Sequence, residues 1–264
     1  MTASDGSLEA GRLLAFALDA TASPGTAGAS ADYAHLVERY LQDAPFRLVF
    51  DGVVEGVGCS VAAADRNVGV VLRTRADGPW TFPGRGADLP WKSSFDSSHM
   101  RAARALVPMG LLAYVAPTAA DLDDVLADPD RILPVVAVRD LERFIRDFCE
   151  QLESEATDPA HAGERPLWWH WLQLPAEIPT PRRASRGTTA HLVYDVLSFL
   201  NGLGLLVDID SSRAATDKKY RPRRRLLYHY RDLALDDVFT SLQRYATKTG
   251  TVEPADVETG GTQD

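Results

Sequence analysis

The sequence has few of the groups on which secreted proteins and metal-binding proteins depend. It contains only two cysteines, Cys59 and Cys149, which lie far apart and have no second pair beside them. This pattern excludes a disulfide framework and a four-cysteine zinc site, and it favours two small buried side chains. No apolar run approaches the roughly 20 residues of a membrane-spanning helix, and the acidic first residues lack the basic and apolar parts of a signal peptide. We therefore expect a cytoplasmic protein without contact to a membrane.

The chain also lacks the common motifs of catalysis. No Walker A or G-x-S-x-G sequence is present, and the pair of glycines in residues 56–58 is not followed by the third glycine of a dinucleotide-binding turn. The six histidines have no metal-ligand spacing, and the acids Asp121, Asp123 and Asp124 are not followed by the glycine and glutamate of a calcium loop. We therefore expect no cofactor, no bound metal and no enzymatic activity.

What the chain does have is enough apolar residues for a sizeable core. It has 264 residues, of which 45% are hydrophobic, so one large or two small domains are possible. Apolar residues at helical spacing predict helices at 8–18, 32–41, 99–115, 139–154, 188–201 and 233–245. Short β-favouring runs predict strands at 46–54, 59–63, 68–73, 133–138, 205–209 and 226–230. The fold class predicted is α+β, mostly helical, with small antiparallel β ribbons.

Composition shifts divide the chain into four parts. Residues 20–30 and 78–98 are rich in Gly, Pro and Ser and are typical of loops. We predict an N-terminal helix and flexible loop at 1–30, an N-terminal module at 31–96, a C-terminal domain at 97–248 and a disordered tail at 249–264. The strands at 46–73 fit either a small antiparallel sheet or the wing of an earlier winged-helix module. Residues 117–124 are expected to form an acidic connection.

The most informative stretch is the helix at 188–201 and the ribbon after it. Thr188 and Thr189 offer an N-cap, and the glycines at 202 and 204 end the helix. The two strands that follow enclose a polar, basic segment that is too polar to pack in a core, as expected of a wing. Because a helix, a short strand and a second helix precede this stretch, the order predicts a winged-helix domain, with residues 157–186 as a long insertion.

Charge is concentrated in this ribbon. Residues 180–231 carry 11 Lys and Arg against 4 acids, a net charge of +7, so the rest of the chain carries −16 within a total of −9. A basic ribbon on an acidic body produces an oriented field that favours nucleic acid. Two other interpretations stay open: a solvated face that protects a hairpin edge from aggregation, or a dock for an acidic protein.

Three tryptophans, Trp168, Trp169 and Trp171, lie within the predicted insertion. Three indoles in four residues cannot all face one side of a helix or strand, so at least one should reach another surface. Exposed Trp often anchors an interface, and we predict that these residues bind a partner. The alternative is packing against the adjoining helices.

Three stretches carry a resemblance to a known family. They are ALVPMGLLAYVAPTAADLDD at 105–124, VVAVRDLERFIRDFCEQLE at 135–153 and KKYRPRRRLLYHYRDLA at 218–234. In these stretches and in element order over residues 31–246, the chain resembles kite-type, MukE-like accessory subunits of bacterial SMC or condensin-like complexes, including the plasmid-restricting Wadjet and Mks type.

The resemblance implies tandem winged-helix domains, a homodimer, and binding to an SMC-like ATPase and a kleisin-like subunit, with DNA held by phosphate contacts. It implies a scaffold in chromosome organisation or in defence against plasmid DNA. The DNA-binding residues that it implies are Arg182, Arg183, Arg186, Arg213, Lys218, Lys219, Arg221, Arg223, Arg224 and Arg225.

Two alternative functions come from other classes. In a free-standing transcription regulator the helix at 188–201 would enter the major groove, but it carries no Lys or Arg to contact guanine. In a metal-dependent hydrolase or nuclease, Asp208 and Asp210 would share one face of a strand, but such a site needs further acids.

Overall fold

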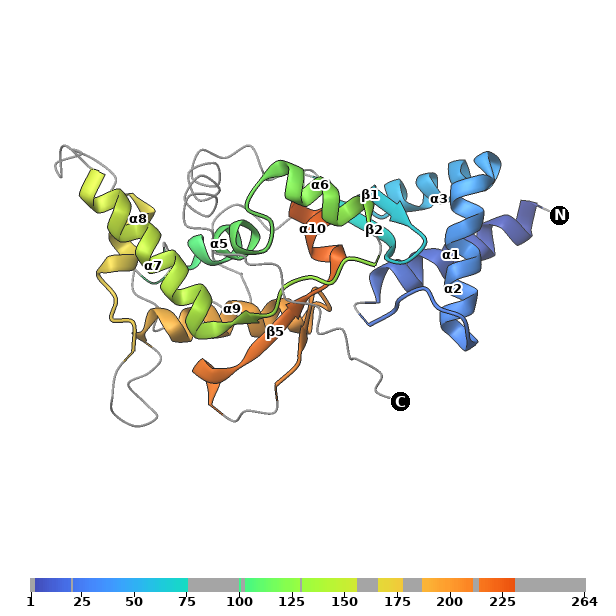
Figure 1. Cartoon of the computed structure of the whole chain (residues 1–264). Coiled ribbons are helices and arrows are strands. Elements are labelled where there is room, and N and C mark those ends of the chain that lie inside the picture. Colours follow the sequence, from blue (N-terminus) through green and yellow to red (C-terminus); the bar gives the residue numbers. More distant parts are fainter. Residues whose placement is uncertain are drawn as a thin grey trace, which may run out of the picture. The chain divides into compact units, whose positions relative to one another are not determined.

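A computed structural model describes residues 3–19, 21–75, 100, 103–128, 130–155, 166–177, 187–210 and 214–230 (Figure 1). In this part of the chain the protein is mostly helical with small antiparallel sheets, which confirms the α+β prediction. None of the described helices is long and apolar enough to cross a membrane. The predicted loop at 78–98, helix at 233–245 and tail at 249–264 lie outside the described residues.

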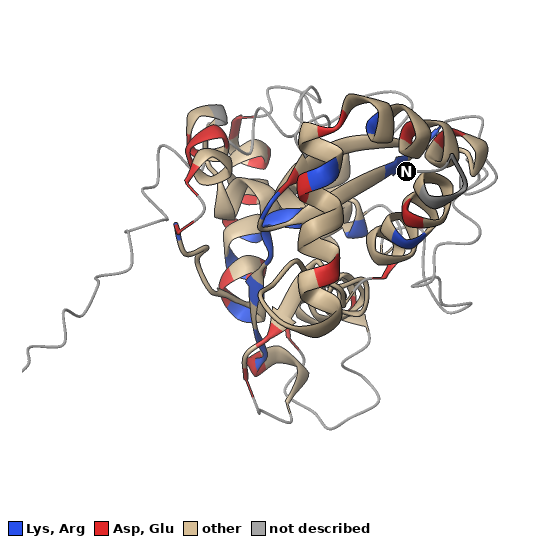
Figure 2. Cartoon of the chain, turned by 90° about the vertical axis from the view of Figure 1, so that its right-hand side faces the viewer, with Lys and Arg blue, Asp and Glu red and all other residues tan. Residues whose placement is uncertain are grey.

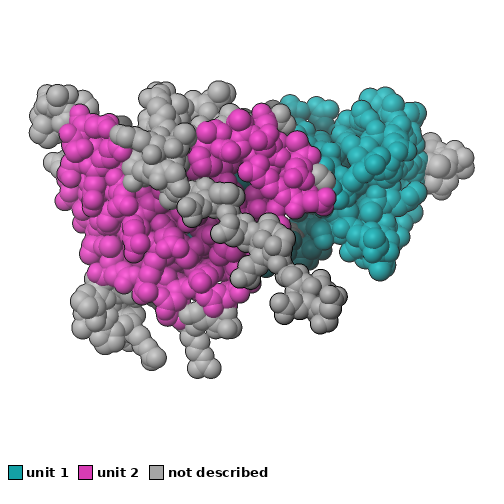
Figure 3. Space-filling model, in the orientation of Figure 1, with its two compact units in different colours: residues 1–97, 195–207, 223–234 teal, residues 98–194, 208–222, 235–264 magenta. Residues whose placement is uncertain are grey.

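The chain forms two compact units, and neither is continuous in sequence (Figure 3). Unit 1 contains residues 1–97, 195–207 and 223–234, and unit 2 contains residues 98–194, 208–222 and 235–264. The division falls inside a helix and inside a strand near residues 195 and 207. Composition gives no signal for it, because loop-like sequence marks only the change near residue 97.

Unit 1 begins with three helices and a hairpin. The elements are α1 (Ala3–Leu18), α2 (Gly28–Gln42), α3 (Ala44–Gly56), β1 (Cys59–Asp65) and β2 (Gly69–Thr74), with β1 and β2 antiparallel. Leu13, Val37, Phe50 and Val70 are buried in one core shared by the three helices and the hairpin. The predicted helices at 8–18 and 32–41 and the strands at 59–63 and 68–73 are confirmed.

The strand predicted at 46–54 is wrong, because these residues belong to helix α3. The Asp43 side chain accepts a hydrogen bond from the Phe46 N–H at 3.1 Å, and Pro45 lies in the first turn. Phe46, Phe50 and Val54 recur every four residues and are all buried. An N-cap acid followed by proline is a helix-start signal, and here it outweighs the β-favouring composition of the run.

The strand predicted at 226–230 is also wrong. Residues 224–230 form helix α10 (Arg224–Tyr230), which contacts β1 and β2 of unit 1 and buries Leu226 and Leu227. The second ribbon strand is instead β5 (Lys219–Pro222), inside the segment expected to be the basic tip. Proline at its end has no N–H to continue a ladder, so the chain can turn into a helix there.

Unit 2 is built around the amphipathic helix α7 (Val138–Glu155), which the sequence predicted at 139–154. It follows β3 (Val136–Ala137), which lies inside the predicted strand, and it packs on α5 (Leu106–Val115) and α8 (Leu167–Leu172). Gly110 of α5 allows the close approach, since an added Cβ would overlap the Ile145 side chain. The helix expected at 99–115 is thus described mainly as α5.

The acidic connection expected at 117–124 is a helix, α6 (Ala119–Ala127). The Thr118 hydroxyl accepts from the Asp121 N–H at 3.0 Å, and the Asp121 carboxylate accepts from the Thr118 N–H at 3.0 Å. This capping box satisfies two N–H groups at the helix start. Asp121, one of the three acids that lack the calcium-loop pattern, therefore serves in a helix cap.

Helix α9 (Thr189–Gly202) and strand β4 (Leu206–Asp208) confirm the helix predicted at 188–201 and the strand at 205–209. Gly204 has a φ of 66° and ends the helix, and the Leu205 N–H donates to the Leu200 carbonyl at 2.9 Å. The sheet order is β3-β5-β4, with β3 and β5 antiparallel, and the 3-10 helix η2 (Ala215–Asp217) precedes β5.

Candidate nucleic-acid interface

Two cations stand on one exposed face of β5. The burial of this strand alternates, so that Lys219 and Arg221 are exposed while Tyr220 and Pro222 are buried. Neither cation has an ion pair with another described residue. Figure 2 shows the basic residues in blue and the acidic residues in red. Alternate residues of a strand lie about 7 Å apart on one face, so both side chains can reach the same partner.

The neighbouring Lys218 is already paired. Its Nζ donates to Asp208 Oδ2 at 2.7 Å and to the Asp210 carbonyl at 2.9 Å. The hydrogen bond raises the pKa of Lys218 and lowers the pKa of Asp208. No group of three metal-ligating side chains occurs in the described part of the chain, and Asp208 serves as the partner of a lysine. The pair of acids gives no support to a nuclease site.

Arg139 of α7 holds the segment that leads into β5. Its Nε donates to Glu177 at 2.9 Å and its guanidinium forms an ion pair with Asp217 of η2 at 2.9 Å. The hydrogen bond to Glu177 raises the pKa of Arg139. The charged residues directly before β5, Asp217 and Lys218, are therefore paired within unit 2. Lys219 and Arg221 are the cations of β5 that have no ion pair with a described residue.

The side chain of Arg225, another of the predicted phosphate contacts, is engaged within unit 1. Its half-buried guanidinium donates to the backbone carbonyls of Ala17 and, at 3.4 Å, Asp19 at the C-terminal end of α1. Burial lowers its pKa. The carbonyls at a helix C-terminus carry partial negative charge and lack partners within the helix, so an arginine stabilises them. The phosphate contact that the resemblance implies for Arg225 stays a prediction; in the structure this side chain caps the C-terminal end of α1 within unit 1.

The other predicted phosphate contacts are divided. Arg223 and Arg224 are half-buried and belong to unit 1, whereas Lys219 and Arg221 belong to unit 2. Arg182, Arg183, Arg186 and Arg213 lie outside the described residues. Their contact with DNA stays a prediction.

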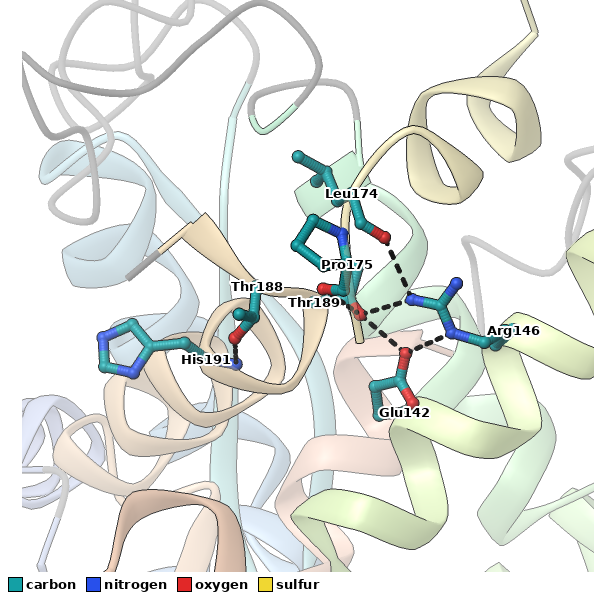
Figure 4. Close-up of polar contacts among 7 residues, drawn as sticks. All are labelled: Glu142, Arg146, Leu174, Pro175, Thr188, Thr189 and His191. Carbon is teal, nitrogen blue, oxygen red and sulfur yellow. Dashed lines mark hydrogen bonds and ion pairs between the residues drawn. The ribbon is translucent and has the colours of Figure 1, made fainter. Parts of the chain in front are cut away.

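The first turn of α9 is buried against the preceding segment of the chain (Figure 4). Thr188 and Thr189 are 2% and 0% exposed, and the N–H groups of Thr189 and Ala190 donate to the carbonyls of Pro175 and Ala176 at 3.0 and 3.2 Å. The His191 N–H donates to the Thr188 hydroxyl at 3.2 Å, so Thr188 is the N-cap that the sequence predicted. A helix whose first turn is buried cannot place that turn in a DNA groove.

The tryptophan cluster is split between core and surface. Trp171 is completely buried, and its indole N–H has no hydrogen-bond partner in the described part of the chain. It therefore packs in the core, as the alternative interpretation held, and cannot anchor a partner in this conformation. Trp168 and Trp169 are half-buried, with the Trp169 ring edge-on to His170 at a centroid distance of 5.2 Å. These two residues are the remaining candidates for a partner contact.

Comparison of the chain with protein-family models, with curated proteins and with solved structures finds no match.

Proposed function

We propose that the protein is a non-enzymatic, DNA-engaging scaffold subunit of an SMC-like complex in chromosome organisation or defence against plasmid DNA. The observation that carries the proposal is the exposed face of β5, where Lys219 and Arg221 have no partner among the described residues. Two cations on one strand face, without a base-reading helix beside them, suit contact with phosphates.

The order of the elements supports the winged-helix interpretation of unit 2 and the residues that join it. Helix α5, strand β3, helices α7 and α9 and strands β4 and β5 occur in the predicted order, with the unpredicted helices α6 and α8 between them and with β5 in place of the strand expected at 226–230. In unit 1, three helices precede the β1–β2 hairpin, which is compatible with a second such module. A homodimer that binds an SMC-like ATPase and a kleisin-like subunit in the cytoplasm is part of the same proposal.

Among the alternatives, an acidic protein partner is the stronger one. The same two cations could bind carboxylates, since both kinds of contact are electrostatic. The transcription regulator is less well supported, because the buried Thr188 and Thr189 cannot read bases.

The experiment is a salt titration of binding to a duplex. If Lys219 and Arg221 each neutralise one phosphate, replacing both by Ala should reduce the slope of log K against log salt by about 1.8, since each phosphate contributes about 0.9. Lys218→Ala is the matched control: its side chain is engaged by Asp208, so the slope should change by less than about 0.5.

A slope that is unchanged in the double variant would remove β5 from the DNA interface. If the unmodified chain binds no duplex, the DNA part of the proposal fails.

Purification of the tagged chain from nuclease-treated lysate, followed by mass spectrometry, tests whether the proposed complex forms. A large coiled-coil ATPase and a kleisin-like protein are expected there, and their absence would contradict the scaffold.

A further inference from the structure

Two side chains of α7, Glu142 and Arg146, and one of α9, Thr189, form a largely buried polar cluster, which we call the clasp (Figure 4). Arg146 Nε donates to Glu142 Oε1 at 2.9 Å, and the Thr189 hydroxyl donates to the same oxygen at 2.6 Å. A second guanidinium nitrogen of Arg146 donates to the Thr189 hydroxyl at 2.8 Å. The three side chains thus satisfy one another in a closed triangle.

The clasp also binds the backbone that enters α9. Arg146 donates to the Leu174 carbonyl at 3.2 Å, directly before the Pro175 and Ala176 carbonyls that accept from the first N–H groups of α9. One ion pair on α7 therefore fixes both the chain after α8 and the start of α9. These segments are 28 and 43 residues away from Arg146 in sequence.

Burial makes the clasp sensitive to any missing member. The side chains of Glu142 and Arg146 are 9% and 19% exposed, and Thr189 is 0% exposed. A buried ion pair adds little to global stability compared with apolar side chains of the same size, yet loss of one partner leaves a polar group unsatisfied. Such a pair can instead select one arrangement of the backbone around it.

We infer that the clasp is a conformational lock, which holds the Leu174–Ala176 backbone against the start of α9 without being a main source of the stability of unit 2. The Thr189 hydroxyl is the central group, because it is the one atom that contacts both charged side chains. The inference is independent of DNA binding and stands whether or not the proposed function is correct.

The two charges are not equivalent. The partial positive charge at the start of α9 favours the Glu142 carboxylate and disfavours an unpaired Arg146. Glu142→Gln should therefore loosen the start of α9 more than Arg146→Gln, although both variants lose the same ion pair.

The test is hydrogen exchange of the full chain, comparing the amides of residues 189 and 190 with the amide of Val138, which donates to the Lys218 carbonyl at 3.0 Å. Thr189→Val keeps the shape of the side chain and removes the hydroxyl, whereas Thr189→Ser keeps the hydroxyl. We expect about tenfold faster exchange at positions 189 and 190 in the valine variant, less than about threefold in the serine variant, and little change at Val138.

A second variant separates the lock from stability. Glu142→Leu with Arg146→Met should leave the urea midpoint within about 0.5 M of the original while exchange at 189 and 190 is still accelerated. Equal acceleration at Val138 in the valine variant would mean a global role and would overturn the inference. Unchanged exchange at 189 and 190 in both the valine variant and the Glu142→Leu, Arg146→Met variant would also overturn the inference. So would exchange in the serine variant that is as fast as in the valine variant.

Discussion

The β1–β2 hairpin of unit 1 and the β5 strand of unit 2 both carry basic side chains, but in different surroundings. In the first hairpin, Arg66 pairs with Glu38 of α2 at 2.6 Å, and Arg75, after β2, pairs with Glu55 of α3 at 2.7 Å. On β5, Lys219 and Arg221 have no ion pair with a described residue. The number of basic residues in a segment therefore does not measure its available positive charge, because acids on the adjoining helices decide how much of it is neutralised.

The β1–β2 hairpin and the start of β5 also differ in the contacts that hold them. The Tyr33 hydroxyl of α2 accepts from the Val70 N–H at 2.9 Å, and Tyr33 is 1% exposed. Gly69 beside it has a φ of 89°. Directly before β5, Lys218 forms a partly exposed ion pair with Asp208 at 2.7 Å. A buried hydroxyl thus holds the backbone of the β1–β2 hairpin, whereas the ion pair before β5 is partly exposed and is therefore weaker and more sensitive to salt.

The largest effect is expected from Gly69→Ala. A side chain there is strained by the positive φ and would overlap the Tyr33 hydroxyl. The free energy of unfolding should therefore fall by about 3 kcal/mol. Urea unfolding measures the change. Gly52→Ala on α3 is the control: an added Cβ meets nothing within 4 Å, and replacing a helical glycine should stabilise by up to about 1 kcal/mol. Equal effects at both positions would show that the first hairpin is not tightly packed.

The next effect is a pH dependence of unit 1. Burial first, and then Arg225 and Arg73, lower the pKa of His229 from 6.5 to about 4. The folded state therefore prefers the neutral imidazole of His229. Its contribution to the free energy of unfolding is complete above about pH 6.5 and is lost as the pH falls toward 4. The predicted loss is at most about 3 kcal/mol.

Urea unfolding at several pH values measures this loss, and His229→Gln should remove the part that depends on His229. If the variant keeps the same pH slope between 6.5 and 4, other groups are responsible. Lys218 is not among the groups that shift the pKa of His229, so Lys218→Ala should leave the part of the slope that depends on His229 unchanged.

The smallest effect separates two arginines that the sequence treats alike. Arg225→Met removes two hydrogen bonds to the end of α1 and should reduce stability by about 2 kcal/mol without altering the salt slope of DNA binding. Arg221→Met should change stability by less than about 0.5 kcal/mol and reduce the slope by about 0.9. Thermal unfolding and the salt titration measure both quantities. The reverse assignment of effects would show that Arg225, not Arg221, contacts phosphate.

The sequence predicted the elements whose pattern is long or bounded by clear signals. Helix α7 was recognised because its apolar residues keep helical spacing over five turns, and α9 because threonine and glycine mark its ends. Helices α3 and α10 were read as strands because their short apolar and aromatic runs fit both periods. Asp43 and Pro45 before α3 were the signal that could have corrected the first of these.

At the candidate site, the sequence identified Lys219 and Arg221 as possible phosphate contacts but could not separate them from Lys218 and Arg225. The difference depends on partners: Asp208 lies ten residues from Lys218, and the carbonyl of Ala17 lies 208 residues from Arg225. The clasp was missed for the same reason, since Glu142 and Thr189 are 47 residues apart. No local pattern reports such a contact.

The sequence by itself determined the fold class, the confirmed helices and the concentration of basic residues in one segment, because periodicity and composition are properties of neighbouring residues. The tertiary structure alone decided which cations stay open, which threonines are buried and where the two units divide. These properties depend on atoms that folding brings together from distant parts of the chain, where a carbonyl or a carboxylate within about 3 Å determines whether a charge is available to a partner.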